Sequence, residues 1–475
     1  MTEYSNEYFD DYDPALIDRF EDMLESRRPC FFDVEDIENL ADYYLEKGNH
    51  FKARKAISHG LEMHPGSSAL MLKQAHALLM IQEPHKAMKI LTFLEAAEPM
   101  NTEMLLFKAV VHRNLSDHEG TRQCLQKALE AHPENKQEIF LDLAFEQELA
   151  EDYIGAIESL TQSLELNPNH EETLFELVYC FDMAEDMEKG VEYFLTYLDK
   201  FPYSFIGWYN LSLCFDKLGL YEKAVEAIDY SIAIKEDFTN AYIQKGNLYV
   251  AMNEDLLAVE TYAESLEYDD QNPMVHAAIG EVYERLAEMN LAEAAYQRAL
   301  AIDRNYVDAL LGMGAVREWE GKFKACFTFY REAINHDELN LENWHVYAEA
   351  LLRANYLVEA EQAYRHMVKT FEADEESWTG LAEVLDAADR TNEAHELLIE
   401  AVASFDSTHD VMWFLTKYLL KMGRNQEGAE MLARVLESDP DGASFFQTIY
   451  PDYIHLPNIA GLVNLHAKAS EANEF

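Results

Sequence analysis

The chain has 475 residues, of which 49% are hydrophobic, and 89 acidic against 37 basic side chains give it a formal net charge of −52. The apolar share is ordinary for a folded protein and argues against a wholly disordered chain. The charge disfavours binding to nucleic acid or to anionic lipid and favours cationic partners, although it is also compatible with a role in solubility alone.

The N-terminal segment, residues 1–33, is predicted to be an acidic tail followed by a capping helix. The first thirteen residues hold five acids and four aromatic side chains but no base. That composition predicts a disordered tail, and the alternative is that its aromatic residues dock on the folded part. Asp13 and Pro14 are suited to the N-cap and the first turn of a helix. The apolar face of this helix consists of Leu16, Ile17, Phe20, Met23 and Leu24.

An internal repeat dominates the rest of the chain. Five prolines, at positions 65, 99, 133, 168 and 202, recur at intervals of 34, 34, 35 and 34 residues. Each lies between two apolar-periodic segments, where proline can precede a helix but cannot continue one. The register predicts twelve units over residues 34–440, each with two helices. Their first residues are Val34, Ser68, Thr102, Gln137, Glu171, Phe205, Thr239, Pro273, Val307, Leu341, Glu375 and His409.

Small and large residues alternate in fixed columns of this register. The eighth and twentieth positions of a unit are small almost throughout, as in Ala41 and Ala53, so the two helices can approach closely there. The twenty-fourth position is large in every unit, as in Ile57 and Tyr296. Such a pattern is typical of antiparallel helix pairs with interdigitating side chains. Turns such as Lys47-Gly48-Asn49, Leu218-Gly219-Leu220 and Met422-Gly423-Arg424 separate the two helices, with glycine at the cap.

These columns resemble the signature of the tetratricopeptide repeat family, W-x2-L-G-x2-Y followed by A-x3-F/Y, A and P. The sixth unit matches it most fully, with Trp208, Leu211, Ser212, Phe215, Gly219, Tyr221, Ala224, Ile228 and Ser231. The resemblance implies an all-α fold, a right-handed superhelical solenoid of about twelve helix-turn-helix repeats with atypical capping helices. It also implies binding of polypeptides on the concave surface lined by first helices.

The C-terminal segment, residues 441–475, is predicted to cap the last unit. Phe446 and Ile449 occupy positions where a further first helix would have its apolar residues, and Pro451 ends that helix. A last amphipathic helix over about 457–471 is predicted to cover the end of the array.

Motifs for catalysis, cofactors or metals are weak. Gly312-Met313-Gly314 lies within a predicted helix, whereas a nucleotide-binding loop follows a strand. His395-Glu396 lacks the second histidine of a zinc-protease helix. The five cysteines are scattered, and equivalent helices are too far apart for Cys180 and Cys214 to pair. The sequence therefore predicts no enzyme, no cofactor and no metal site.

The resemblance places a peptide-binding groove on the first helices of the fourth to seventh units, at the positions that face away from the second helices. Aromatic and acidic side chains alternate there, which suits a partner segment with apolar anchors and Lys or Arg. The candidate residues are Phe145, Phe175, Glu176, Tyr179, Asp182, Tyr209, Asn210, Leu213, Asp216, Gln244 and Asn247. The amides of Asn210, Gln244 and Asn247 are expected to bond the peptide backbone.

Together these features predict a scaffold or adaptor that binds protein segments. The start of the chain shows no signal-peptide pattern and no segment suggests a membrane span, so a cytoplasmic location is expected. Two alternatives stay open: a self-assembling structural protein that forms homo-oligomers, and a regulatory subunit of a separate enzyme.

Overall fold

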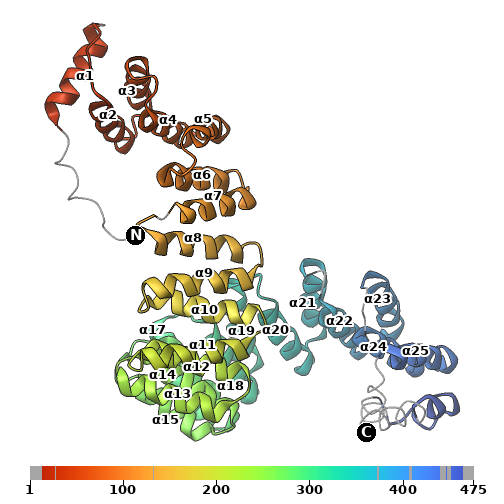
Figure 1. Cartoon of the computed structure of the whole chain (residues 1–475). Helices are drawn as coiled ribbons and strands as arrows, with labels where there is room; N and C mark the ends of the chain where they lie inside the picture. Colours follow the sequence, from red (N-terminus) through yellow and green to blue (C-terminus); the bar gives the residue numbers. More distant parts are fainter. Residues whose placement is uncertain are drawn as a thin grey trace. The chain divides into compact units, whose positions relative to one another are not determined.

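The computed structural model describes residues 13–26, 28–131, 133–371, 374–405, 409–438, 446 and 451–463. Every regular element within these residues is helical, and twenty-five of the helices have defined bounds. They form two compact units, Met1–Glu236 and Asp237–Phe475. Each unit contains six of the predicted antiparallel helix pairs, stacked in chain order (Figure 1).

The first helix of each pair begins at the residue that the register predicts in all but one repeat. In the first unit these helices are α2 (Val34–Glu46), α4 (Ser68–Met80), α6 (Thr102–Asn114), α8 (Lys136–Glu148), α10 (Glu171–Met183) and α12 (Phe205–Lys217). In the second unit they are α14 (Thr239–Ala251), α16 (Pro273–Arg285), α18 (Val307–Trp319), α20 (Leu341–Arg353), α22 (Glu375–Ala387) and α24 (His409–Lys421). The exception is α8, which begins one residue before the predicted Gln137, where the repeat contains its extra turn residue.

The second helices pack antiparallel against the first. In the first unit they are α3 (His50–Met63), α5 (Pro84–Ala97), α7 (His118–Glu130), α9 (Tyr153–Leu166), α11 (Met187–Lys200) and α13 (Tyr221–Ile234). In the second unit they are α15 (Asp255–Ser265), α17 (Met289–Ile302), α19 (Phe323–His336), α21 (Leu357–Thr370), α23 (Thr391–Ser404) and α25 (Asn425–Ser438). In the part of the chain that the structure describes, no helix is long and apolar enough to cross a membrane.

The turn between the two helices of a repeat contains one residue with positive φ in every repeat. The predicted Gly48, Gly219 and Gly423 have φ of 68°, 69° and 74°. After α2, Asn49 donates its N–H to the carbonyl of Tyr44 at 2.7 Å, which is the bonding of a Schellman cap. Other repeats place a non-glycine residue in this left-handed conformation, as Ala287 does with φ of 59°.

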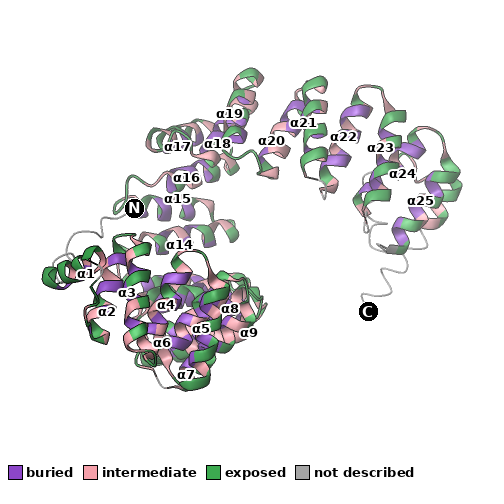
Figure 2. Ribbon diagram, turned by 90° about the horizontal axis from the view of Figure 1, so that it is seen from above, coloured by how far each residue is buried: buried purple, intermediate pink, exposed green. Residues whose placement is uncertain are grey.

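The core of each unit lies between neighbouring helices, and exposed residues cover the outer surfaces (Figure 2). The predicted small columns are buried there, as are Ala41, Ala53 and Ala224. Where the eighth position of a repeat is glycine, it leaves room for the large side chain at the twenty-fourth position. A Cβ atom on Gly280 would lie only 2.5 Å from Cε1 of Tyr296. The column pattern therefore sets how closely the two helices pack.

Additional helices lie at both ends of the described chain. Helix α1 (Pro14–Ser26) is capped by Asp13, whose Oδ1 accepts the N–H of Ala15 at 2.9 Å. It buries Phe20 against Phe32 and Tyr44, with ring centroids 5.9 and 5.8 Å apart. At the other end, residues 457–463 form a short helix that packs in one cluster with Phe446 and α24.

Several predicted features fall outside the described residues. These are the acidic tail over residues 1–12, the end of the repeat array at residue 440, Ile449, and the last helix beyond residue 463. The handedness of the superhelix and the division into tail, array and C-terminal cap stay predictions.

Candidate peptide-binding groove

Three aromatic side chains on first helices of the first unit are exposed. Phe145 on α8 is 50% exposed, and Phe175 and Tyr179 on α10 are 36% and 47% exposed. We call these three residues the aromatic strip. They lie on successive repeats at positions that the register assigned to the groove. Large aromatic side chains left in water are favourable anchors for a partner, because covering them removes apolar area from solvent.

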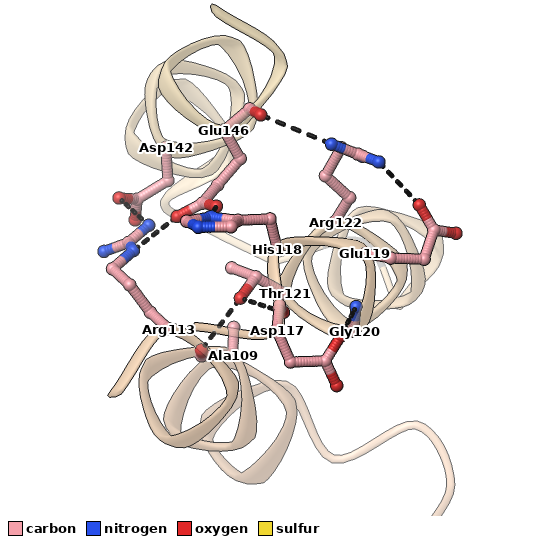
Figure 3. Close-up of polar contacts among 10 residues, drawn as sticks. All are labelled: Ala109, Arg113, Asp117, His118, Glu119, Gly120, Thr121, Arg122, Asp142 and Glu146. Carbon is pink, nitrogen blue, oxygen red and sulfur yellow. Dashed lines mark hydrogen bonds and ion pairs between the residues drawn. The ribbon is translucent and has the colours of Figure 1, made fainter. Parts of the chain in front are cut away.

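A polar network surrounds Glu146, the residue that follows Phe145 in the sequence (Figure 3). Glu146 on α8 is fully buried, and its Oε1 accepts from Arg113 Nε at 2.5 Å. His118, at the start of α7, lies with Nδ1 2.9 Å from the other carboxylate oxygen. Arg113 also donates to Asp142 at 3.1 Å. Because a buried carboxylate requires such partners, the network locks α6, α7 and α8 together.

The same arginine supports the aromatic strip. The guanidinium carbon of Arg113 lies 5.9 Å from the ring centre of Phe145, within the range of a cation–π contact. Arg113 is thus held by two carboxylates while one of its faces meets the aromatic ring. The sequence register did not single out this arginine, although it occupies a groove position of the third repeat.

Tyr209 on α12 continues the aromatic surface but is not a free anchor. Its ring meets that of Phe175 edge to face, with centroids 5.7 Å apart. The side chain is half-buried, and burial raises the pKa of its hydroxyl. Leu213, one turn further along α12, is also half-buried. Tyr179 in turn contacts Tyr153 at the start of α9, with ring centroids 6.4 Å apart. The rings therefore link successive repeats.

Two carboxyl groups meet between α8 and α10, beside the aromatic strip. Glu176 on α10 is exposed and shares a hydrogen bond with Glu148, the last residue of α8. Burial of Glu148 and the neighbouring Glu176 raise the pKa of Glu148 to about 7. Cys180 also donates to Glu148, with Sγ 3.5 Å from Oε1. Like charges this close hold a proton near neutral pH, and a cation placed between them would release it.

The two other acidic residues that the sequence placed in the groove, Asp182 and Asp216, are less available to a partner than expected. Asp182 forms an ion pair with Lys217 of the next first helix, with Nζ 2.6 Å from Oδ2. Asp216 on α12 is half-buried. Neither residue is therefore a freely exposed charge like Glu176.

The predicted role of two of the three amide residues requires correction. Asn210 is fully buried and donates to the carbonyl of Leu174 at 2.8 Å, so its amide joins α12 to α10 and does not face a peptide. Gln244 is buried as well. Asn247 is exposed, but its Oδ1 accepts the hydroxyl of Tyr262 at 2.6 Å. Both Gln244 and Asn247 belong to the second unit, and the groove described here is formed by the first.

Cysteine and histidine side chains are further candidate ligands. Cys180 and Cys214 are free and buried, and burial raises the pKa of both thiols. In the described part of the chain, His345, Asp374 and Glu376 have ligand atoms within 4.8 Å of one another. Asp374 is the N-cap of α22 and accepts from His345 Nε2 at 3.0 Å. Helix capping and the hydrogen bond to His345 therefore explain the position of Asp374 in this cluster.

The fold and groove define the protein as a helical repeat solenoid with a surface of exposed aromatic and acidic side chains. A family model described as "Tetratricopeptide repeat" matches residues 207–238, 239–272 and 275–306. The same register continues through the other helix pairs on either side of the matched segment. Residues 207–306 therefore contain tetratricopeptide repeats, and the other helix pairs share their register.

Known proteins resemble the chain at low identity. The TPR repeat-containing protein YpiA of Bacillus subtilis is 22% identical over 346 residues, which are 70% of this chain and 78% of YpiA. The Hsp70-Hsp90 organising protein of Plasmodium falciparum is 31% identical over 103 residues, which are 22% of this chain and 40% of that protein. The crystal structure of yeast Tom70 superposes with a TM-score of 0.46 at 16% identity and covers 92% of this chain and 96% of Tom70.

Proposed function

We propose that the chain is a non-catalytic scaffold or adaptor that binds a polypeptide segment on the first helices of its first unit. The binding surface consists of the aromatic strip, the half-buried Tyr209 and Leu213, and the carboxyl pair formed by Glu148 and Glu176. Its partner carries apolar side chains for the strip and Lys or Arg for the carboxyl groups. A cytoplasmic location is compatible with this function.

The observation that carries the proposal is the exposure of Phe145, Phe175 and Tyr179 on consecutive repeats. Contacts between neighbouring first helices make the surface continuous. Arg113 on α6 meets Phe145, Glu148 on α8 bonds to α10, and Phe175 on α10 meets α12. Because these helices are held rigidly by their repeats, a flexible partner alone loses conformational freedom on binding.

The electrostatic setting favours a basic partner. The whole chain carries −52 charges, so a cationic segment is attracted before contact. At the surface itself, Glu176 is exposed and the Glu148 carboxyl group has its pKa raised to about 7 by burial and by Glu176. A cation bound between the two groups removes their repulsion. The matched tetratricopeptide repeats and a relative named Hsp70-Hsp90 organising protein support a protein partner in general.

Selection from a displayed library of short random peptides tests the proposal. We expect enriched peptides to combine apolar side chains with Lys or Arg. Their affinity should fall by about 1–2 kcal/mol in Tyr179→Ala and by a similar amount in Phe175→Ala, with little dependence on salt. Glu176→Gln should mainly slow association, and added salt should have the same effect on the parent chain.

Two control variants test whether binding is specific to the proposed surface on the first helices. Phe93 on α5 is 61% exposed but lies on a second helix, so Phe93→Ala should bind as the parent chain does. Glu226 on α13 is an exposed carboxylate on a second helix, and Glu226→Gln should be equally silent. Full affinity in a folded Phe175→Ala/Tyr179→Ala chain would remove this groove as the binding site. If the selection enriches no peptide, and light scattering shows that the molecular mass of the particles rises with protein concentration, the self-assembling alternative would be favoured instead.

A further inference from the structure

A row of buried tyrosines runs through the second unit. Tyr262, Tyr296, Tyr330 and Tyr364 occupy the twenty-fourth position of four consecutive repeats, and each is at most 3% exposed. Each ring passes beside a small residue of a first helix, so its hydroxyl reaches the first-helix side. A Cβ atom on Gly314, for example, would lie 2.2 Å from Cε1 of Tyr330.

Three of the four hydroxyl groups have an acceptor on the first helix of their own repeat. Tyr262 donates to Asn247 at 2.6 Å, Tyr296 donates to Glu284 at 2.9 Å, and Tyr330 donates to Glu318 at 3.3 Å. Glu284 and Glu318 occupy the twelfth position of their repeats. Buried hydroxyl groups are generally paired in this way, because an unpaired one loses its hydrogen bond to water without replacement.

The fourth hydroxyl group has no such acceptor. In the tenth repeat the twelfth position is Leu352, which cannot accept a hydrogen bond. Among the described residues, Tyr364 therefore has no hydrogen-bond partner for its hydroxyl, although the residue is only 3% exposed. A Cβ atom on Gly380 would lie 2.9 Å from this hydroxyl oxygen, so the group ends beside α22.

The Tyr364 hydroxyl group lies at a cavity of about 600 Å³ formed by α20, α21, α22 and α24. Leu352, Phe414 and the ring of Tyr364 supply its apolar lining, and Glu349, Glu376, Glu383 and Asp410 supply carboxyl groups. We call it the Tyr364 pocket. A neighbouring cavity of about 470 Å³ shares Glu349 and Glu376 with it. The two cavities together give room for a side chain and for the peptide backbone that carries it.

The carboxyl groups of the pocket exceed the cations that neutralise them. Arg353 donates to Glu349 at 2.8 Å and also to Glu318. Lys417 lies 3.3 Å from Glu383. Glu376 reaches only His345, at 4.0 Å, and its side chain is 68% exposed. Asp410 is exposed and has neither an ion pair nor a hydrogen bond within the described residues. Two carboxyl groups are thus available to a positively charged ligand.

We propose that the Tyr364 pocket binds an arginine side chain from a basic peptide segment. This site lies in the second unit and is independent of the groove proposed in the first. The occupant is a peptide because the adjoining cavity extends the space beyond that of one side chain. Arginine fits because its planar guanidinium carries five N–H donors and also stacks on aromatic rings.

Each part of the pocket matches one part of that side chain. The unpaired Tyr364 oxygen accepts one N–H group, while Glu376 and Asp410 accept others. The ring of Phe414 already has a cation over it, since Lys417 Nζ lies 5.1 Å from its centroid. Leu352 and the Tyr364 ring cover the aliphatic stem. Burial and the charges of Glu349, Glu383 and Glu376 raise the pKa of the Tyr364 hydroxyl, which stays neutral and able to accept.

Titration of three synthetic peptides into the full chain tests this assignment. The peptides are identical, with one central residue that is arginine, lysine or the uncharged isostere citrulline. We expect the arginine peptide to bind at least about tenfold more tightly than the citrulline peptide, because a hydrogen bond to a charged group contributes about 1.5–3 kcal/mol. Lysine should bind between the two. Equal binding of arginine and citrulline would overturn the proposal.

Matched variants show where the peptide binds. Tyr364→Phe removes only the unpaired oxygen and should weaken the arginine peptide about threefold to tenfold, whereas Tyr330→Phe should not change its binding. Glu376→Gln/Asp410→Asn should lose about tenfold or more of the affinity, and Glu359→Gln/Glu400→Gln, with changes on α21 and α23, should lose none. Unchanged binding in both Tyr364→Phe and Glu376→Gln/Asp410→Asn would refute the site.

Other outcomes distinguish this proposal from three alternatives: binding to the overall negative charge, a metal site, and binding in the first unit. Equal losses in Glu376→Gln/Asp410→Asn and Glu359→Gln/Glu400→Gln would assign binding to the overall negative charge and overturn the pocket. Tight binding of zinc chloride that displaces the arginine peptide would assign the site to a metal instead. Phe175→Ala/Tyr179→Ala should leave arginine binding unchanged, so failure here and failure of the first-unit groove are separable results.

Discussion

The ring of Tyr296 is held between two glycines, and this arrangement allows a sharp test of the packing. A Cβ atom on Gly280, within the same repeat, would lie 2.5 Å from the ring, and one on Gly312, in the next repeat, would lie 2.1 Å from it. Since Tyr296 is fully buried, the ring has little space into which to move. We therefore expect Gly280→Ala to destabilise the protein, although alanine is the better helix former.

The magnitude follows from two opposing contributions. Overpacking a well-packed core costs about 1–3 kcal/mol, and a contact this short on a confined ring belongs near the upper end. Replacing glycine by alanine within a helix contributes about 1 kcal/mol of stabilisation. The net loss for Gly280→Ala is then about 2 kcal/mol. Helix propensity alone predicts the opposite sign.

A double variant provides the control. The first four repeats combine alanine at the eighth position with an aliphatic residue at the twenty-fourth, as in Ala41 with Ile57. Gly280→Ala/Tyr296→Leu recreates that combination, so its loss of stability should be smaller than the sum of the two single losses.

Hydrogen exchange of peptides from α16 and α17 measures local opening in each variant, which suits an array that need not unfold in one step. Exchange should be about 30-fold faster in Gly280→Ala. Slower exchange than in the parent chain, or strictly additive effects in the double variant, would refute this account of the column pattern.

Two further predictions concern the first unit. Ala224 is fully buried at the twentieth position of the sixth repeat, so Ala224→Leu should cost about 1–3 kcal/mol, measured by thermal unfolding; an unchanged midpoint would show that the helices do not touch there. The pKa of Glu148 is raised to about 7 by burial and Glu176, so its contribution to stability is present below about pH 4.5 and is lost as pH rises through 7. Glu148→Gln should therefore unfold at a higher temperature than the parent chain above pH 7 and show less pH dependence, and equal pH profiles would contradict the carboxyl pair.

The fold was largely predictable because a repeat register constrains many positions at once. Proline spacing and the small columns placed the start of almost every first helix, and Gly48, Gly219 and Gly423 marked turns that the structure confirms. The residue that closes the same turn in other repeats, such as Ala287, could not be predicted, since its left-handed conformation is imposed by the helices that it joins.

The exposure of individual residues on the first helices was predicted less well, because a position on a helix does not determine what its side chain contacts. The register placed Phe175 and Tyr179 where the structure exposes them. The same rule placed Asn210 in the groove, but its buried amide donates to the carbonyl of Leu174 on the neighbouring first helix. The Tyr364 pocket could not be predicted from the sequence. It depends on Leu352 at the twelfth position, where the two preceding repeats have an acidic residue, and only the structure shows that the tyrosine hydroxyl group points to that position.

Site-specific photo-crosslinking tests the central claim, that first helices of the first unit bind polypeptide, most directly. A benzophenone amino acid placed at position 175, on α10, should crosslink to a peptide selected by the parent chain. The same amino acid at position 93, exposed on the second helix α5, is the control and should not. We predict crosslinking from position 175, and we predict that an excess of unlabelled peptide suppresses it. Crosslinking at 93 alone, or equally at both positions, would contradict the assignment of the groove.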